Sequence, residues 1–220
     1  MILATVCLLA ACFAICVWSV KLGWWLGPLA AAPVAALYVW VLAFFRDPER
    51  ATPEDPGLIV APADGRVTDV TNIGADSKLG RDGVRIGIFM NVLNVHVNRS
   101  PVTGVVESVE HHRGAFLDAR NRHASERNES TTIRLSHDCG GRRFPVVVRQ
   151  IAGCIARRIV TDLREGQTVR RGRRIGMIKF GSRLEVLLPA ELVGQIRVQV
   201  GASSRAGETV LAEARQGDAQ

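Results

Sequence analysis

The sequence predicts a mainly β body with few helices, preceded by an N-terminal transmembrane helical hairpin. Two observations carry this prediction. Lys21 is the only charged residue in positions 1–45, whereas the remainder of the chain carries 27 basic and 21 acidic residues. Beyond residue 57, short segments rich in Val and Ile alternate with polar residues between glycines, which is typical of strands. We therefore expect a membrane-anchoring segment at 1–45, a linker at 46–57 and a β-rich domain at 58–220.

The anchor consists of two apolar runs. Residues 2–20 and 22–45 contain 19 and 24 residues, and a helix of either length approaches or exceeds the roughly 30 Å of bilayer hydrocarbon. A cleaved signal peptide is the alternative, but it normally opens with basic residues and is not followed at once by a second apolar run. Arg46 and Arg50 outnumber Lys21, so the positive-inside rule places the body on the cytoplasmic face of the cell (inner) membrane. Prolines in the second run leave open whether it crosses completely.

The body reads as a succession of short strands with one helical candidate, residues 116–128. The predicted strands cover 57–63, 65–73, 84–90, 104–112, 130–136, 142–153, 157–163, 174–189 and 195–200. Glycine-spaced turns in 163–182 and 200–212 resemble those of barrel-sandwich domains, the class of biotinyl and lipoyl carriers. This favours a β-sandwich or barrel-sandwich-hybrid-like core. It also leaves a non-catalytic membrane-anchored adaptor as the alternative function, although carriers display a lysine at a hairpin tip and Lys179 falls inside a predicted strand.

Composition argues against several other classes of protein. Cys139 and Cys154 are isolated, and the histidines of 111–123 lack the spacing of a metal site, so we expect neither a disulfide framework nor a metal. The arginines of 170–174 and the net charge of +7 suit an anionic partner. In a membrane-anchored chain we expect that partner to be an anionic lipid surface, worth about 1 kcal/mol per arginine, and no nucleic acid.

Three polar residues interrupt apolar or turn sequence and could carry chemistry: Asp64, His96 and Ser182. Each also has an ordinary structural interpretation. Asp-Gly is a frequent turn pair, a histidine between valines is commonly a hydrogen-bonded core residue, and Gly181-Ser182 could be a bulge. The sequence alone does not bring the three together.

Six blocks that contain these residues resemble the phosphatidylserine decarboxylase family, most closely its short, archaeal-type branch. They occur in the family's order and cover roughly residues 44–190: FFRDPER, VAPADGRV, NVHVNRSP, GAFLDARNRHASERNES, QIAGCIARRIV and GRRIGMIKFGSRLEVLLP. The resemblance implies an enzyme that converts phosphatidylserine to phosphatidylethanolamine and carbon dioxide.

The resemblance also implies a self-made cofactor. The Gly181-Ser182 bond would break, giving a β chain of residues 1–181 and an α chain of residues 182–220 that remain together as a heterodimer. Ser182 would become a covalent pyruvoyl group, which forms a Schiff base with the substrate amine. A serine hydroxyl needs a base, and a histidine oriented by an aspartate is a general solution, so His96 and Asp64 are the expected partners. His96 is also the candidate to protonate the carbanion left by decarboxylation.

Two positions depart from the pattern of longer members of the family. Those enzymes carry a second histidine three residues after the first, where this chain has Arg99, and a Ser or Thr after the motif serine, where it has Arg183. Either His96 serves both self-cleavage and decarboxylation, or Asp64 acts in cleavage with less help from a histidine.

Overall fold

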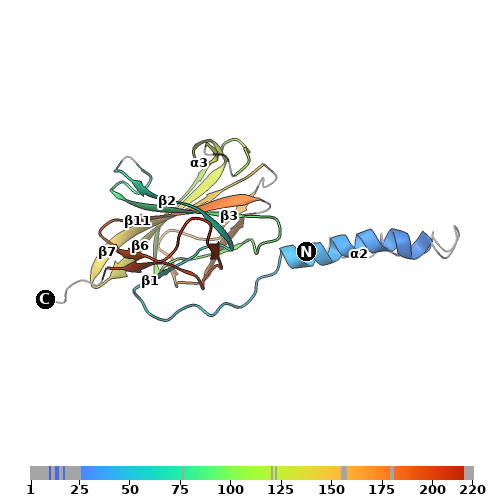
Figure 1. Cartoon of the computed structure of the whole chain (residues 1–220), viewed down its shortest axis with the longest axis horizontal. Coiled ribbons are helices and arrows are strands. Elements are labelled where there is room, and N and C mark those ends of the chain that lie inside the picture. The colour runs from blue at the N-terminus through green and yellow to red at the C-terminus, as the bar shows by residue number, and fades with distance from the viewer. Residues whose placement is uncertain are drawn as a thin grey trace. The chain divides into compact units, whose positions relative to one another are not determined.

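A computed structural model describes the chain at residues 10, 13–14, 17, 26–75, 77–119, 121, 123–154, 158–178 and 181–215 (Figure 1). The chain divides into two compact units, Met1–Arg46 and Asp47–Gln220.

The described part of the first unit is dominated by helix α2 (Leu26–Phe44), which contains Pro33 and lies within the second predicted apolar run. Among the described residues, no helix is both long and apolar enough to cross a membrane. The first predicted crossing, residues 2–20, falls almost entirely outside the described residues. The transmembrane hairpin therefore stays a prediction.

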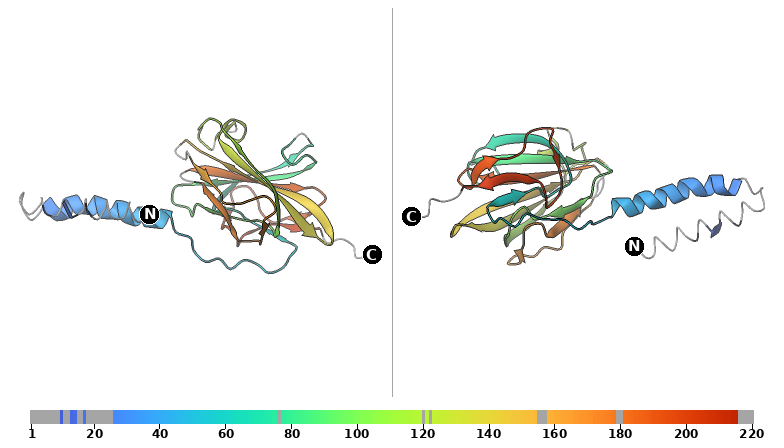
Figure 2. Two further views of the ribbon diagram at one scale, coloured as in Figure 1. Left: turned by 180° about the vertical axis from the view of Figure 1, so that it is seen from behind. Right: turned by 60° about the horizontal axis from the view of Figure 1, so that its bottom comes forward.

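The second unit is built on a large antiparallel sheet, which curls as Figures 1 and 2 show. In spatial order its strands are β13 (Ser203–Ser204), β2 (Gly65–Ile73), β3 (Gly83–Met90), β11 (Ser182–Pro189), β7 (Arg142–Ile151), β6 (Ser130–Cys139), β5 (Gly104–His112) and β9 (Thr168–Val169). Two three-stranded sheets accompany it. One contains β1 (Leu58–Val60), β14 (Val210–Ala214) and β12 (Val193–Ile196), and the other contains β4 (Val97–Arg99), β10 (Arg174–Ile178) and β8 (Ile159–Val160).

All three sheets contribute to one hydrophobic core. Ile88 and Ile133 enter it from the large sheet, Ile59 and Leu211 from the first small sheet, and Ile178 from the second. The prediction of a mainly β body is confirmed. Its strand pairing gives a curled main sheet with two small companions rather than two equal layers of a sandwich.

The strands expected over 57–63, 157–163 and 195–200 are shorter or shifted, as β1, β8 and β12, and two further predicted elements differ more strongly. The strand expected over 174–189 is divided into β10 and β11, which belong to different sheets. The helix expected over 116–128 is reduced to α3 (Ala124–Arg127). The Asn128 side chain explains this, because its amide accepts a hydrogen bond from Leu117 N at 2.9 Å and donates to Leu117 O at 2.8 Å. These bonds close the segment as a loop instead of letting a helix continue.

The predicted linker is fastened along the second unit by arginine side chains. Arg99 donates to Pro48 O at 3.0 Å and to Asp47 Oδ1 at 2.5 Å. Arg171 donates to three backbone carbonyls of the stretch from Pro53 to Leu58. This corrects one expectation, because Arg171 belongs to the cluster predicted to face lipid and is instead tied to the linker.

Candidate active site

The three predicted site residues lie at corresponding ends of neighbouring strands. Ser182 begins β11, and the chain reaches it from the end of β10. His96 directly precedes β4, whose Val97 pairs with Met177 near that same end of β10. Strand pairing thus places His96 next to the end of β10.

Asp64 reaches the same end of the body through the large sheet. It precedes β2, where Arg66 pairs with Phe89 of β3, and Phe89 also pairs with Arg183 of β11. Asp64 and Ser182 therefore both lie just before one row of residues that crosses three strands. Since adjacent strands are about 4.8 Å apart, the backbones of the outer two strands are separated by about 10 Å.

Ser182 is a buried serine with an unusual environment. Its side chain is fully buried, and Oγ has no hydrogen-bond partner within the described part of the chain. A buried hydroxyl without a partner is destabilising, so such groups are rare and suggest a functional role. Gly181, which precedes it, has a φ of 54°, in the left-handed region that favours glycine. The Gly181-Ser182 bond therefore lies at a sharp corner between two sheets rather than inside one strand.

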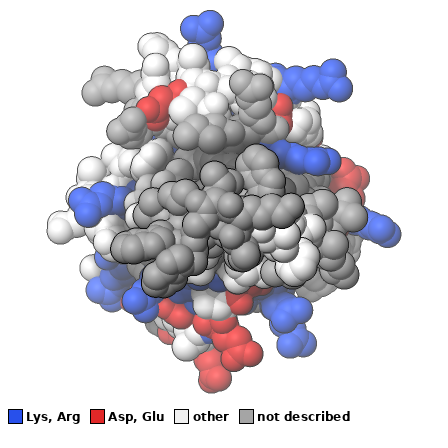
Figure 3. All heavy atoms as spheres, turned by 90° about the vertical axis from the view of Figure 1, so that its right-hand side faces the viewer, with Lys and Arg blue, Asp and Glu red and all other residues white. Residues whose placement is uncertain are grey.

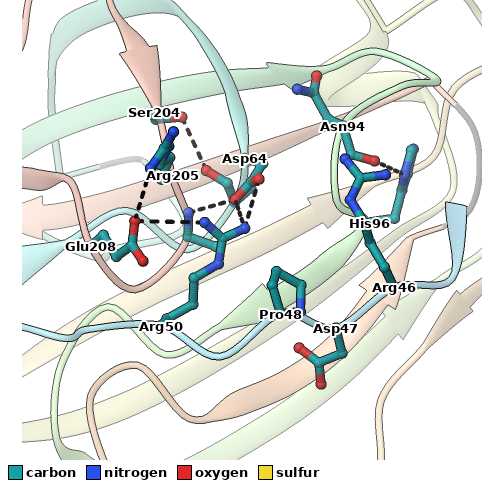
Figure 4. A network of polar contacts seen from close by, with 12 residues as sticks. Arg46, Asp47, Pro48, Arg50, Asp64, Asn94, His96, Ser204, Arg205 and Glu208 are labelled. Atoms are coloured by element: carbon teal, nitrogen blue, oxygen red, sulfur yellow. Dashed lines mark hydrogen bonds and ion pairs between the residues drawn. The ribbon is translucent and has the colours of Figure 1, made fainter. Parts of the chain in front are cut away.

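His96 is fully buried and its ring orientation is fixed by a local contact. Nδ1 lies 2.9 Å from Asn94 O (Figure 4). Because a backbone carbonyl only accepts hydrogen bonds, Nδ1 carries the proton in this contact. In the neutral imidazole, Nε2 then holds the lone pair, so it is the nitrogen able to accept a proton.

The Asp64 carboxylate forms an ion pair with an arginine of the linker. Arg50 donates to its two oxygens at 2.8 and 3.0 Å, and the Ala206 N–H donates to Oδ1 at 2.8 Å. Arg50 also lies 3.6 Å from Glu208, and Figure 4 shows these groups together. Within the described residues Asp64 contacts neither His96 nor Ser182. The structure thus places Asp64 and Ser182 at one end of the large sheet and His96 at the start of β4 in the second small sheet, and it does not join Asp64 to His96 as a hydrogen-bonded pair.

A network of charges that sequence reasoning missed follows the candidate cleavage bond. Glu185 is fully buried, and it accepts hydrogen bonds from Arg183 at 3.1 Å, Arg149 at 2.9 Å and Ser125 Oγ at 2.7 Å. Arg183 also donates to Asp69 at 2.5 Å. A central strand that is buried on both faces is expected to be almost entirely apolar, and Arg183 and Glu185 are charged. These two charged residues are the signal that could have revealed the network.

Polar side chains also line the interior beside Met90, the β3 residue that pairs with Ser182. Asn98 donates to Met90 Sδ at 3.7 Å and accepts from Gln150 Nε2 at 2.8 Å. Both amides are fully buried. Among the described residues, no group of three or more His, Cys, Asp or Glu side chains is placed to hold a metal ion.

Comparisons with known proteins place these observations in a family context. The model of a family described as phosphatidylserine decarboxylase matches residues 37–212. A phosphatidylserine decarboxylase proenzyme of Nitrobacter winogradskyi is 47% identical over 205 residues, covering 92% of this chain and 77% of that protein. One of Azorhizobium caulinodans is 47% identical over 180 residues, covering 80% of this chain and 75% of that protein.

Proposed function

Because the chain belongs to the phosphatidylserine decarboxylase family, we propose that it converts phosphatidylserine to phosphatidylethanolamine and carbon dioxide with a pyruvoyl group made from Ser182. The observation that carries the proposal is the buried, unpartnered Ser182 hydroxyl directly after a left-handed Gly181. The non-catalytic adaptor considered from sequence has no support in the comparisons.

Self-cleavage would begin with addition of Ser182 Oγ to the carbonyl carbon of Gly181. A new C–O bond forms, the Gly181–Ser182 C–N bond breaks, and the serine proton is transferred to the released amine. The ester then eliminates the Gly181 carboxylate as the Ser182 Cα proton is removed. Water hydrolyses the resulting dehydroalanine, leaving the pyruvoyl group and ammonia. All the carbon atoms of the group come from the chain itself.

His96 is the residue best suited to move protons in both reactions. Its Nδ1–H is donated to Asn94 O, so the lone pair of the neutral ring is on Nε2, the nitrogen that can act as a base. Arg99 does not replace the missing second histidine, since a guanidinium stays protonated and this one is bound to Asp47, Pro48 and Gly172. We infer that His96 transfers protons in both self-cleavage and decarboxylation. The negative charge of Asp64 would act on the same site.

The pyruvoyl carbonyl would condense with the substrate amine and withdraw the electron pair left by carbon dioxide. That group would be shielded from water, because Ser182 is fully buried at the start of β11. Burial strengthens electrostatic interactions and excludes water from the reacting atoms.

The test is the mass of the purified chain. We expect the 23.9 kDa polypeptide to be replaced by fragments corresponding to residues 1–181 and 182–220, the second with a blocked N-terminus. Ser182→Ala should leave the chain intact and without decarboxylase activity, and Asp64→Ala should prevent cleavage. An intact wild-type chain with full activity, or an active Ser182→Ala variant, would overturn the proposal.

We further propose that the enzyme works at the cell (inner) membrane, with the second unit in the cytoplasm and anchored by the N-terminal hairpin. Arg170, Arg173 and Arg174 are exposed and available to anionic lipid. On the face that Figure 3 shows, basic side chains lie with acidic ones among them, so the attraction would be local rather than spread over that face. Exchange of these three arginines for glutamine should weaken binding of the full chain to vesicles containing anionic lipid; equal binding would contradict the lipid contact.

A further inference from the structure

Gly153 lies directly against the bond that is proposed to break. It follows β7, two residues after Ile151. A methyl group at Gly153 would overlap the carbonyl oxygen of Gly181, and it would lie 2.9 Å from the carbonyl carbon and 3.5 Å from the Ala119 methyl. The space that a side chain would fill at this position is thus occupied by the carbonyl that receives the Ser182 hydroxyl.

The two glycines on either side of this contact are needed for different reasons. Gly181 has a left-handed φ of 54° and open space around its Cα, so its lack of a side chain serves backbone conformation. Gly153 is not among the described glycines with positive φ. An alanine would therefore suit its backbone, and among the described atoms around it only those of the Gly181 carbonyl exclude one.

The backbone before Gly153 has little freedom to retreat. Ala152 N donates to Glu129 O at 2.9 Å, and Asn128 Nδ2 donates to Ala152 O at 2.7 Å. Asn128 is itself bound to Leu117 through both ends of its amide. A side chain at 153 would consequently displace the Gly181 carbonyl rather than its own backbone.

We propose that Gly153 is a positioning residue for self-cleavage, which fixes where the Gly181 carbonyl oxygen lies when Ser182 Oγ adds to the carbonyl carbon. The inference rests on the proposed function. During addition the C=O bond becomes a C–O⁻ single bond, the Oγ–C bond forms and the C–N bond later breaks, so the oxygen must keep its place while its carbon becomes tetrahedral. A displacement of about 1 Å at a reacting centre is enough to slow a reaction by roughly 100-fold.

The test is the rate of self-cleavage in Gly153→Ala, followed by intact mass from the time of synthesis. We expect cleavage to be slower by about 100-fold or more, in protein whose Tm shows that it is folded. Gly104→Ala is the matched control. A methyl there would lie 2.6 Å from the Ser136 carbonyl oxygen, so it also meets a backbone carbonyl, but one far along β6 from the cleavage bond. This control should lose stability and still be cleaved at the wild-type rate.

A second variant keeps the test decisive if Gly153→Ala does not fold. Gly153→Ala combined with Ala119→Gly removes the Ala119 methyl, which the new side chain would approach to 3.5 Å, and so makes room beside residue 153. We expect this double variant to fold and to be cleaved more slowly than wild type. Cleavage of either folded Gly153→Ala variant at the wild-type rate would overturn the inference alone, whereas an uncleaved wild-type chain would overturn the proposed function.

Discussion

At the scale of single residues, Arg50 and Asp64 link the linker to the candidate active site. The carboxylate of Asp64 receives both of its arginine hydrogen bonds from one guanidinium, and the exposed fractions of the two side chains are only 8% and 13%. Both bonds come from Nη2, while Nη1 lies 3.6 Å from Glu208, so one planar guanidinium spans two carboxylates in a geometry that a lysine ammonium does not reproduce. The linker therefore does more than connect two units, because it sets the geometry of a predicted site residue.

We expect Arg50→Ala to slow self-cleavage strongly and to lower the free energy of unfolding by about 2 kcal/mol, since it leaves Asp64 without its charged partner. Arg50→Lys should retain part of both properties. Time-resolved mass measurement and urea unfolding report the two effects. Arg205→Ala, which removes a neighbouring exposed arginine near Glu208, is the control and should change neither. Normal cleavage in Arg50→Ala would show that Asp64 needs no help from the linker.

A second prediction at this scale concerns His137, on β6 beside a hollow of about 630 Å³. Burial lowers the pKa of His137 from its ordinary value of 6.5. This effect is larger than the opposing effects of the hydrogen bond to Thr103 O and the charge of Asp138, which raise the pKa. Below pH 6.5 the unfolded chain therefore binds a proton before the folded chain does, and stability falls as the pH is lowered. His137→Gln should flatten the Tm profile between about pH 7 and 5. An unchanged profile would contradict this assignment.

The sequence identified candidate residues that a local motif marks. It did not identify residues whose role depends on packing or pairing with a part of the chain that is distant in sequence. Asp64, His96 and Ser182 interrupt their surroundings, so they could be singled out. Strand pairing places Asp64 and Ser182 at one end of the large sheet and His96 at the start of β4. Gly153 offers no such sign, because its role depends on a carbonyl 28 positions away in the chain. The partner of Asp64 was likewise missed, since nothing local indicates that Arg50 turns back onto it.

At the scale of elements, β11 carries the charged network directly after the bond proposed to be cleaved. Glu185 is buried between Arg183 and Arg149, and Arg183 reaches Asp69 on β2. Burying charges is unfavourable unless each is paired, and removal of one member leaves the others uncompensated. The network thereby fixes the register of the strand whose first residue is Ser182.

We expect Glu185→Gln to destabilise the protein by roughly 3 kcal/mol, because it removes the countercharge of Arg149 and leaves Arg183 with Asp69 alone. The measurement is urea unfolding in the Ser182→Ala background, where the chain is expected to remain whole. Glu191→Gln is the matched control, since its ion pair with Arg81 is exposed and should contribute little. Equal midpoints for the two variants would refute the importance of the buried network.

Long strands could be predicted closely from the sequence, whereas short ones could not. The bounds expected for β2 and β5, 65–73 and 104–112, are those observed. Strands β4, β9 and β13 have two or three residues, too few to show an alternating pattern. The division of 174–189 was missed because both halves are apolar, and apolar content does not reveal that a strand changes sheets.

At the scale of the molecule, the proposed cleavage would divide the body without separating it. The fragment from Ser182 contributes β11 and β13 to the large sheet, and β12 and β14 to the first small sheet. Within the large sheet β11 pairs with β3 on one side and β7 on the other. Both fragments therefore share one core, and native chromatography should never resolve them.

We expect refolding to reveal the cut. After denaturation, the Ser182→Ala chain should regain its structure with a yield independent of dilution, because its folding is unimolecular. The cleaved protein should recover less as it is diluted, because two chains must meet. Circular dichroism after dilution from urea, at several protein concentrations, measures both. A recovery of the cleaved form that does not depend on concentration would contradict the shared core.

The location of Ser182 at the head of an interior strand also has a genetic consequence. A gene divided into two reading frames at that codon would supply a second peptide beginning with an ordinary serine and a free amine. Such a peptide has no acyl linkage to transfer to its hydroxyl, so the chemistry that makes the ketone could not start even if the halves assembled perfectly. Under the proposed function, the two subunits must be translated as a single polypeptide and separated only after they have folded.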